Sequence, residues 1–107
     1  MFSSPNRIPF ETHLDGLKEP ARSIMLDLRA FVKSLGSNVI EEVRPHRVTY
    51  SKTMNLRMFL DVEPRVDSLM LSIRYGRAAP PATATLRTAQ DAENVKKQIA
   101  DAYNKIQ

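Results

Sequence analysis

Side chains that can bind phosphate, nucleic-acid bases or apolar protein surfaces recur between residues 47 and 87. They are Arg47, Arg57, Phe59, Met70, Arg74 and Arg87. Successive side chains of a strand point to opposite faces, so their alternation with apolar residues predicts that they share the outward face of one sheet. Guanidinium groups pair with phosphate oxygens, and an aromatic ring can stack on a base. The spacing therefore predicts a binding surface on an open sheet face.

The occupant of this surface is open to more than one interpretation. Phe59 and Met70 on an open face would suit contact with another protein or with a second copy of the chain, and this is our leading hypothesis. The arginines would alternatively suit a nucleic-acid backbone. Asp61 and Glu63 fall on the same predicted face and could neutralise the arginines. The face would then be only a solvated one, on which arginine stems cover apolar surface.

Catalytic and metal-binding patterns are missing from the sequence. The chain has no cysteine and only three glycines, and it contains neither a phosphate-binding glycine loop nor a nucleophile elbow. His13 and His46 have no ligand-type neighbours at metal-binding spacing. Glu41 and Glu42 are adjacent, so on a strand they face opposite ways and cannot act as a carboxylate pair. We therefore expect a protein that is not an enzyme and that needs no cofactor or metal; a small hydrolase-like or ligand-binding domain is the remote alternative.

Length and composition point to a single domain. The chain has 107 residues, of which 42% are hydrophobic and 26% charged, and its net charge is +4. These values are ordinary for one globular domain, and the mild positive charge slightly favours an acidic partner. The sequence has no apolar run long enough to span a bilayer and no cysteine, so we expect a cytoplasmic protein without a membrane partner.

Apolar residues at helical spacing mark each end of the domain. One stripe comprises Leu14, Leu17, Ala21, Ile24, Leu28, Phe31 and Leu35. Proline suits the first turn of a helix, so the long helix is expected to begin near Pro20 and to leave 14–18 as a separate turn. The second helix is expected over 88–106, with Thr88 as its cap and Asp91 three residues later.

Between the helices the apolar period is two, which predicts strands. The strands are expected at 39–44, 47–51, 55–63, 69–75 and 83–87. In the third, Leu56, Met58, Leu60 and Val62 are expected to face inward. Short connections predict antiparallel hairpins, with the segment 76–82 as the connection expected to depart from that pattern.

The predicted fold is thus an α+β two-layer sandwich in the order α-β-β-β-β-β-α. Its mainly antiparallel five-stranded sheet has both helices on one face. Residues 1–12 are expected to form an irregular N-terminal arm, and residues 13–107 the domain.

The pattern from Leu26 to Tyr103 resembles a family of small domains of unknown function that is loosely labelled as predicted transport proteins. The resemblance is carried by Leu35-Gly36, Val39–Val43, Val48–Tyr50, Leu56–Phe59, Leu69–Ile73 and Ala102-Tyr103. Members stand alone or follow nuclease-like domains. The resemblance implies this fold and, by analogy, an association with nucleic-acid-processing proteins, but it implies no catalytic residues.

Overall fold

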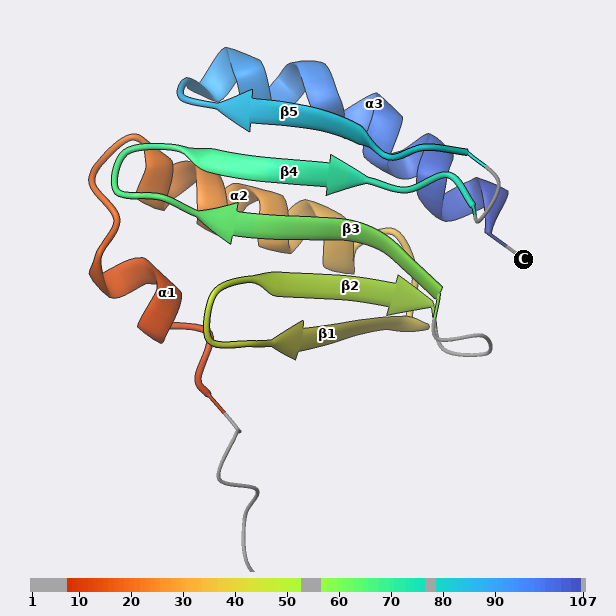
Figure 1. Ribbon diagram of the computed structural model, residues 1–107, viewed down its shortest axis with the longest axis horizontal. Coiled ribbons are helices and arrows are strands. Elements are labelled where there is room, and N and C mark those ends of the chain that lie inside the picture. The colour runs from red at the N-terminus through yellow and green to blue at the C-terminus, as the bar shows by residue number, and fades with distance from the viewer. Residues whose placement is uncertain (1–7, 53–56, 77–78, 107) are drawn as a thin grey trace, which may run out of the picture.

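The computed structural model describes residues 8–52, 57–76 and 79–106, and these form one two-layer α+β sandwich (Figure 1). The helices are α1 (Thr12–Asp15), α2 (Ala21–Lys33) and α3 (Ala89–Lys105). The strands are β1 (Val39–Val43), β2 (Val48–Lys52), β3 (Arg57–Pro64), β4 (Leu69–Ile73) and β5 (Ala82–Leu86). Within the described residues, no helix is long and apolar enough to cross a membrane.

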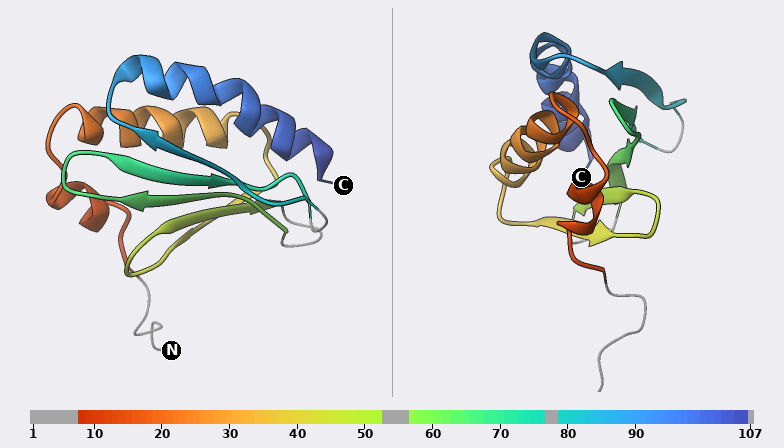
Figure 2. Two further views of the ribbon diagram at one scale, coloured as in Figure 1. Left: turned by 45° about the horizontal axis from the view of Figure 1, so that its top comes forward. Right: turned by 90° about the vertical axis from the view of Figure 1, so that its left-hand side faces the viewer.

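The five strands form an antiparallel sheet in sequence order, from β1 at one edge to β5 at the other. Helices α2 and α3 lie side by side against one face of the sheet, as both views in Figure 2 show. The opposite side, which faces the viewer in Figure 1, is hereafter called the open face. The predicted fold class, including the placement of both long helices on one face, is confirmed.

Local capping sets where the long helices begin. Pro20 precedes the first residue of α2, where its missing N–H costs no hydrogen bond, and α1 is a separate short turn. Thr88 caps α3: its Oγ1 accepts from the backbone N–H of Asp91, and the Asp91 carboxylate accepts from the backbone N–H of Thr88. This reciprocal capping box satisfies amides that the first helical turn leaves unpaired.

The core lies between the helices and the inward side chains of the sheet. Leu60 lies opposite Ile73 and Val62 opposite Leu71 in the register, and all four side chains are buried. The apolar stripes of the two helices close this layer with Ile24, Leu28, Val32, Val95 and Ile99. Phe10, from the segment expected to be an irregular arm, also belongs to the core. Residues 1–7 of that arm lie outside the described residues.

A β-bulge in β3 changes which side chains face outward. Tyr50 pairs with Leu60 but Ser51 pairs with Met58, so Phe59 is an extra residue in its strand. The Phe59 ring is fully buried on the helix side, 5.3 Å from the ring of Tyr103 in α3 and nearly perpendicular to it. The prediction that Phe59 lies on the open face is therefore wrong, because strict alternation fails at the bulge.

The bulge also reverses the faces to which the side chains of the two residues before Phe59 point. Met58 is paired with Ser51 on the open face, although it was expected to face inward. Arg57 is paired with Lys52, whose Nζ lies 4.1 Å from the Tyr103 ring centre on the helix side. Directly opposed residues share a face, so Arg57 belongs to the helix side and not to the open face as predicted. Leu56 lies outside the described residues.

The connection between β4 and β5 also differs from expectation. The two strands are antiparallel neighbours, with Leu69 opposite Leu86 and Ile73 opposite Ala82. Gly76 has a φ of 143°, a conformation that other residues rarely adopt, and it allows the chain to turn back after β4. The connection is thus long but still joins adjacent strands.

The end of α3 is held against the segment that follows α2. The Tyr103 hydroxyl donates to Oδ1 of Asn38, and the Lys52 ammonium donates to the carbonyl of Ile106 at 2.5 Å. A Cβ atom added at Gly36 would lie 2.1 Å from the Tyr103 hydroxyl oxygen. A side chain at position 36 is therefore incompatible with this arrangement.

We expect Gly36→Ala to lower the free energy of unfolding by about 1–3 kcal/mol, because the added methyl group overpacks the contact with Tyr103. Gly16→Ala is the matched control, since a Cβ at Gly16 would meet nothing within 4 Å. That control should be neutral or slightly stabilising. Chemical denaturation of both variants measures the difference, and equal stabilities would contradict the proposed clash.

Candidate functional site

A row of polar side chains crosses the centre of the open face. The register places Glu42 opposite Thr49, Thr49 opposite Asp61, Asp61 opposite Ser72, and Ser72 opposite Thr83. Each of the residues in β2, β3 and β4 lies between two residues that face the helices, so the row points to the open face. These residues, Glu42, Thr49, Asp61, Ser72 and Thr83, are hereafter called the polar row.

Two members of the polar row are buried although no described helix covers them. Thr49 is only 1% exposed and Asp61 7% exposed. Among the described residues, neither Thr49 Oγ1 nor Asp61 Oδ1 has a hydrogen-bond partner. A buried polar atom without a partner costs about 1–3 kcal/mol. The centre of the open face therefore holds unused hydrogen-bonding capacity under its outermost side chains, and an incoming molecule would have to displace that cover to reach it.

The arginines predicted on this face have unequal environments. Arg47 donates from Nη1 to Oδ2 of Asp61 at 3.0 Å, so it serves as the partner of a buried carboxylate. Arg74 follows buried Ile73 just beyond the end of β4, so strand alternation places it toward the open side. Its Nε is buried without a hydrogen-bond acceptor among the described residues. Arg87 is exposed beyond the end of β5, at the start of α3.

Met70 is the other predicted residue on this face. It is half-buried, lies opposite Thr85, and accepts a hydrogen bond at its sulfur from Thr85 Oγ1 at 3.2 Å. The structure thus brings Arg47, Met70 and Arg74 onto the open face and places Arg87 at its margin. Phe59 and Arg57 belong to the helix side, as described above.

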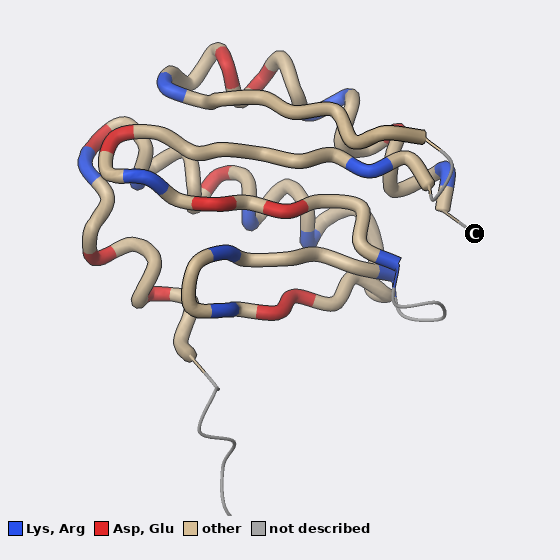
Figure 3. The backbone as a smooth tube through the Cα atoms, in the orientation of Figure 1, with Lys and Arg blue, Asp and Glu red and all other residues tan. Residues whose placement is uncertain are grey.

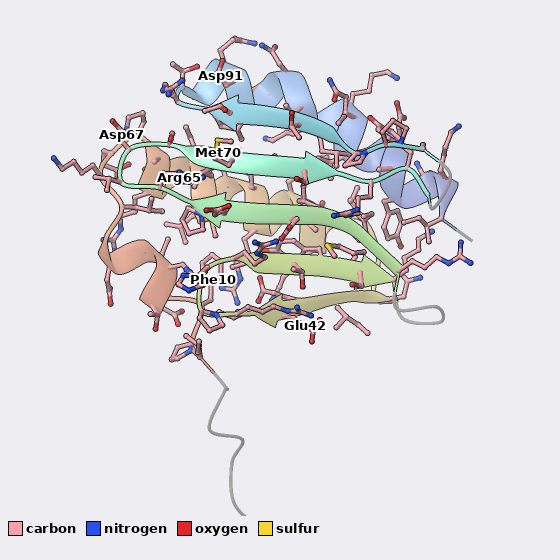
Figure 4. All side chains as sticks on the ribbon, in the orientation of Figure 1. Phe10, Glu42, Arg65, Asp67, Met70 and Asp91 are labelled. Atoms are coloured by element: carbon pink, nitrogen blue, oxygen red, sulfur yellow. The ribbon has the colours of Figure 1, made fainter. Side chains whose placement is uncertain are left out.

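Acidic and basic residues are both present along the strands of the sheet, as Figure 3 shows. Besides the Arg47–Asp61 pair, Arg44 lies 3.1 Å from Glu42, and Arg65 lies 3.3 Å from Glu63. The labelled side chains of Glu42, Arg65 and Met70 show how these groups are spread over several strands (Figure 4). The open face is therefore mixed in charge and is not a basic patch.

A second polar cluster lies on the helix side, where α2 meets β1 and β2. The Glu41 carboxylate accepts two bonds from Arg29, each 3.0 Å long, and one from the Tyr50 hydroxyl at 2.8 Å. Lys33 is 3.6 Å from the same carboxylate, and the Arg29 guanidinium carbon lies 4.0 Å from the Phe10 ring centre. All of these groups satisfy one another, which indicates a structural joint and leaves little capacity for a ligand.

The electrostatics of this joint follow from its contacts. Burial raises the pKa of Glu41, but the hydrogen bonds from Arg29 and Tyr50 and the charges of Arg29 and Lys33 outweigh it, so the pKa is lowered overall. Burial, together with the Glu41 charge, raises the pKa of Tyr50. The cluster is thus held as a carboxylate paired with a guanidinium and a neutral phenol at pH 7.

The histidines do not form a site with the carboxylates. The His13 ring is buried, and its Nε2 lies 2.6 Å from the carbonyl oxygen of Arg44, which ties α1 to the end of β1. No group of three or more His, Asp or Glu side chains in the described part of the chain could hold a metal ion.

The sequence pattern does not single out Thr49, Ser72 or Thr83 as candidate binding residues. Their alternation with apolar residues indicated the outward face, but small hydroxyl side chains attract no attention in a search for charged or aromatic groups. The burial of Asp61 depends on the pairing of β2 with β3, and so on contacts between separate parts of the chain. The row could be recognised only by aligning neighbouring strands, because its members lie opposite one another across the sheet.

Glu41→Gln should lower the free energy of unfolding by about 1–3 kcal/mol at pH 7, because the bonds from Arg29 lose their charged acceptor. The pKa of Glu41 is lowered in the folded chain, so the contribution is present above its ordinary value of 4.5 and is lost as pH falls through the folded value. The difference between the variant and the parent should thus shrink below pH 4.5. Denaturation across this pH range measures the difference. Glu93→Gln is the control: Glu93 forms an exposed pair with Lys96, so its replacement should change the free energy of unfolding little at any pH.

No protein-family model, no curated protein and no solved structure matches this chain. The family resemblance of the sequence pattern therefore stays an expectation.

Proposed function

We propose that this chain is a non-enzymatic binding module whose open sheet face receives another protein. The observation that carries the proposal is the pair of buried, unpartnered polar atoms on Thr49 and Asp61 at the centre of a face that no described helix covers. A partner that completes these hydrogen bonds would gain affinity and orientation from the same groups.

The chemistry of the polar row, together with that of Arg74, fits a polypeptide. Asp61 Oδ1 can only accept while its carboxylate is ionised, the Thr49 hydroxyl can donate or accept, and the Arg74 Nε–H can only donate. A backbone offers N–H donors and carbonyl acceptors at short regular spacing, and amide or hydroxyl side chains offer both kinds of group. One protein segment can thus supply a donor to Asp61 and an acceptor to Arg74.

The charge pattern favours a protein over a nucleic acid. Arg44, Arg47 and Arg65 each lie within 3.3 Å of a carboxylate of the same face. A phosphate backbone approaching this surface would meet Glu42, Asp61 and Glu63 as well as the arginines. Affinity for nucleic acids comes mainly from unneutralised cations, so a face with paired charges is poorly suited to it.

The polarity of the face favours a different protein over a second copy at this position. The apolar side chains directed to it, Ile40, Met58 and Met70, are already half-buried within the monomer. Permanent homodimer interfaces are richer in apolar surface, whereas interfaces between separately folded proteins resemble ordinary protein surface in polarity. We therefore assign the open face to a separately folded partner or to a segment of one.

Ser72→Arg tests this proposal because it places a long cation at the centre of the polar row. Ser72 is half-buried and points to the open face, so the fold should tolerate the change. Short random peptides displayed on phage are selected on the immobilised parent chain. The selected peptides are then assayed for binding to the parent, to Ser72→Arg and to a control variant. Peptide binding should weaken about tenfold, or about 1.4 kcal/mol, with Ser72→Arg.

Ala30→Arg is the matched control, since Ala30 is exposed on α2, on the other side of the molecule. It adds the same charge and should leave peptide binding unchanged. If the selected peptides bind both variants equally, the open face is not the binding surface. If instead the parent chain binds single- or double-stranded oligonucleotides with a steep salt dependence while no peptide is enriched, the occupant is a nucleic acid and the proposal fails.

A further inference from the structure

Strand β5 ends the sheet with an edge that none of its own side chains protects against further pairing. Its residues, Ala82–Leu86, alternate alanine and threonine before the final leucine and include no charge and no proline. Among the described residues, the backbone of β5 makes no hydrogen bond to any element except β4. Soluble proteins usually blunt such an edge with charges, prolines or a bulge, because its free amides and carbonyls can accept another strand.

The opposite edge is protected. β1 carries Glu41 at its centre, and antiparallel pairing of two β1 strands about that residue would bring like charges face to face. The Glu41 carboxylate is also committed to Arg29 and Tyr50, and the carbonyl of Arg44 just beyond β1 is in contact with His13. Of the two edges, β5 is therefore the one open to a further strand.

The sequence of β5 is complementary to itself in an antiparallel arrangement. Centring two copies on Ala84 places Thr83 of each chain opposite Thr85 of the other, and both residues point to the open face. Paired threonines are favourable cross-strand neighbours. On the helix side, Ala82 would lie opposite Leu86 of the second copy, so a small side chain meets a larger one without crowding.

The helix that packs behind β5 has matching charges at its two ends. A twofold axis that makes the β5 strands antiparallel also makes the two α3 helices antiparallel. Asp91 lies in the first turn of α3 and Lys105 in its last turn. In the antiparallel pair, the acidic end of one helix would therefore be on the same side as the basic end of the other. Figure 4 shows Asp91 at the outer side of the sheet, beyond β5.

We propose that the chain forms a symmetric dimer by antiparallel pairing of β5 with β5 of a second copy. The two sheets would join into one continuous sheet, with the helices of both copies on the same side and the open faces side by side. This dimer does not depend on what the open face binds. Of the polar row it involves only Thr83, at the edge strand, and the other four residues of the row lie outside the contact.

Paired substitutions at Thr83 and Thr85 test both the contact and its register. Thr83→Lys with Thr85→Lys puts like charges opposite each other across the proposed edge and should raise the dissociation constant of the dimer at least about tenfold. Thr83→Lys with Thr85→Glu puts opposite charges there twice, and should restore association to the parent level or tighten it. Sedimentation velocity over a range of protein concentrations measures the mass against that of the 12.1 kDa chain.

The paired design separates loss of association from loss of folding, because both double variants carry the same Thr83→Lys change. Thermal unfolding checks that each variant is folded. The proposal is overturned if the parent chain sediments as a monomer at all concentrations up to about 1 mM. A Kd of 1 mM corresponds to an association free energy of only about 4 kcal/mol. Equal dissociation constants for the two double variants also overturn it. A dimer broken by Ser72→Arg but not by the paired lysines would place the contact on the open face, contrary to the proposal.

Discussion

The β-bulge at Phe59 determines which side chains each face of the sheet presents. One extra residue in β3 turns the Phe59 ring into the core, where it meets Tyr103, and turns Met58 outward. The same reversal moves Arg57 to the helix side, beside Lys52. Without the bulge, Phe59 and Arg57 would lie on the open face in place of Met58, and that face would be more aromatic and more basic.

The two polar clusters on either side of the sheet differ in how fully they are satisfied. On the helix side, Glu41 is surrounded by donors from α2 and β2, so its oxygens have partners within the fold. On the open side, Asp61 has one oxygen held by Arg47 and the other left without a partner among the described residues. Fully paired groups stabilise a fold, while incompletely paired groups at a surface mark where another molecule can contribute.

The features that could be predicted from the sequence are those set by neighbouring residues. Pro20 and Thr88 mark helix starts through groups within one turn of themselves, and the apolar periods then identify the sheet and its covered face. The bulge could not be predicted, because strict alternation through Phe59 is equally consistent with a flat strand. The Phe59 ring that the bulge turns inward packs against Tyr103, a residue far along the chain, so local pattern alone does not reveal it.

The place of α3 at the end of the element order has a consequence for how the protein is assembled during synthesis. Every strand pairs with its neighbour in the sequence, so the meander and α2 can form as the chain leaves the ribosome. Until α3 follows, the inward side chains of β4 and β5, such as Leu69 and Leu86, lack the helix that packs over them. A nascent chain that has not yet released α3 therefore exposes apolar side chains of β4 and β5, the kind of surface that chaperones recognise.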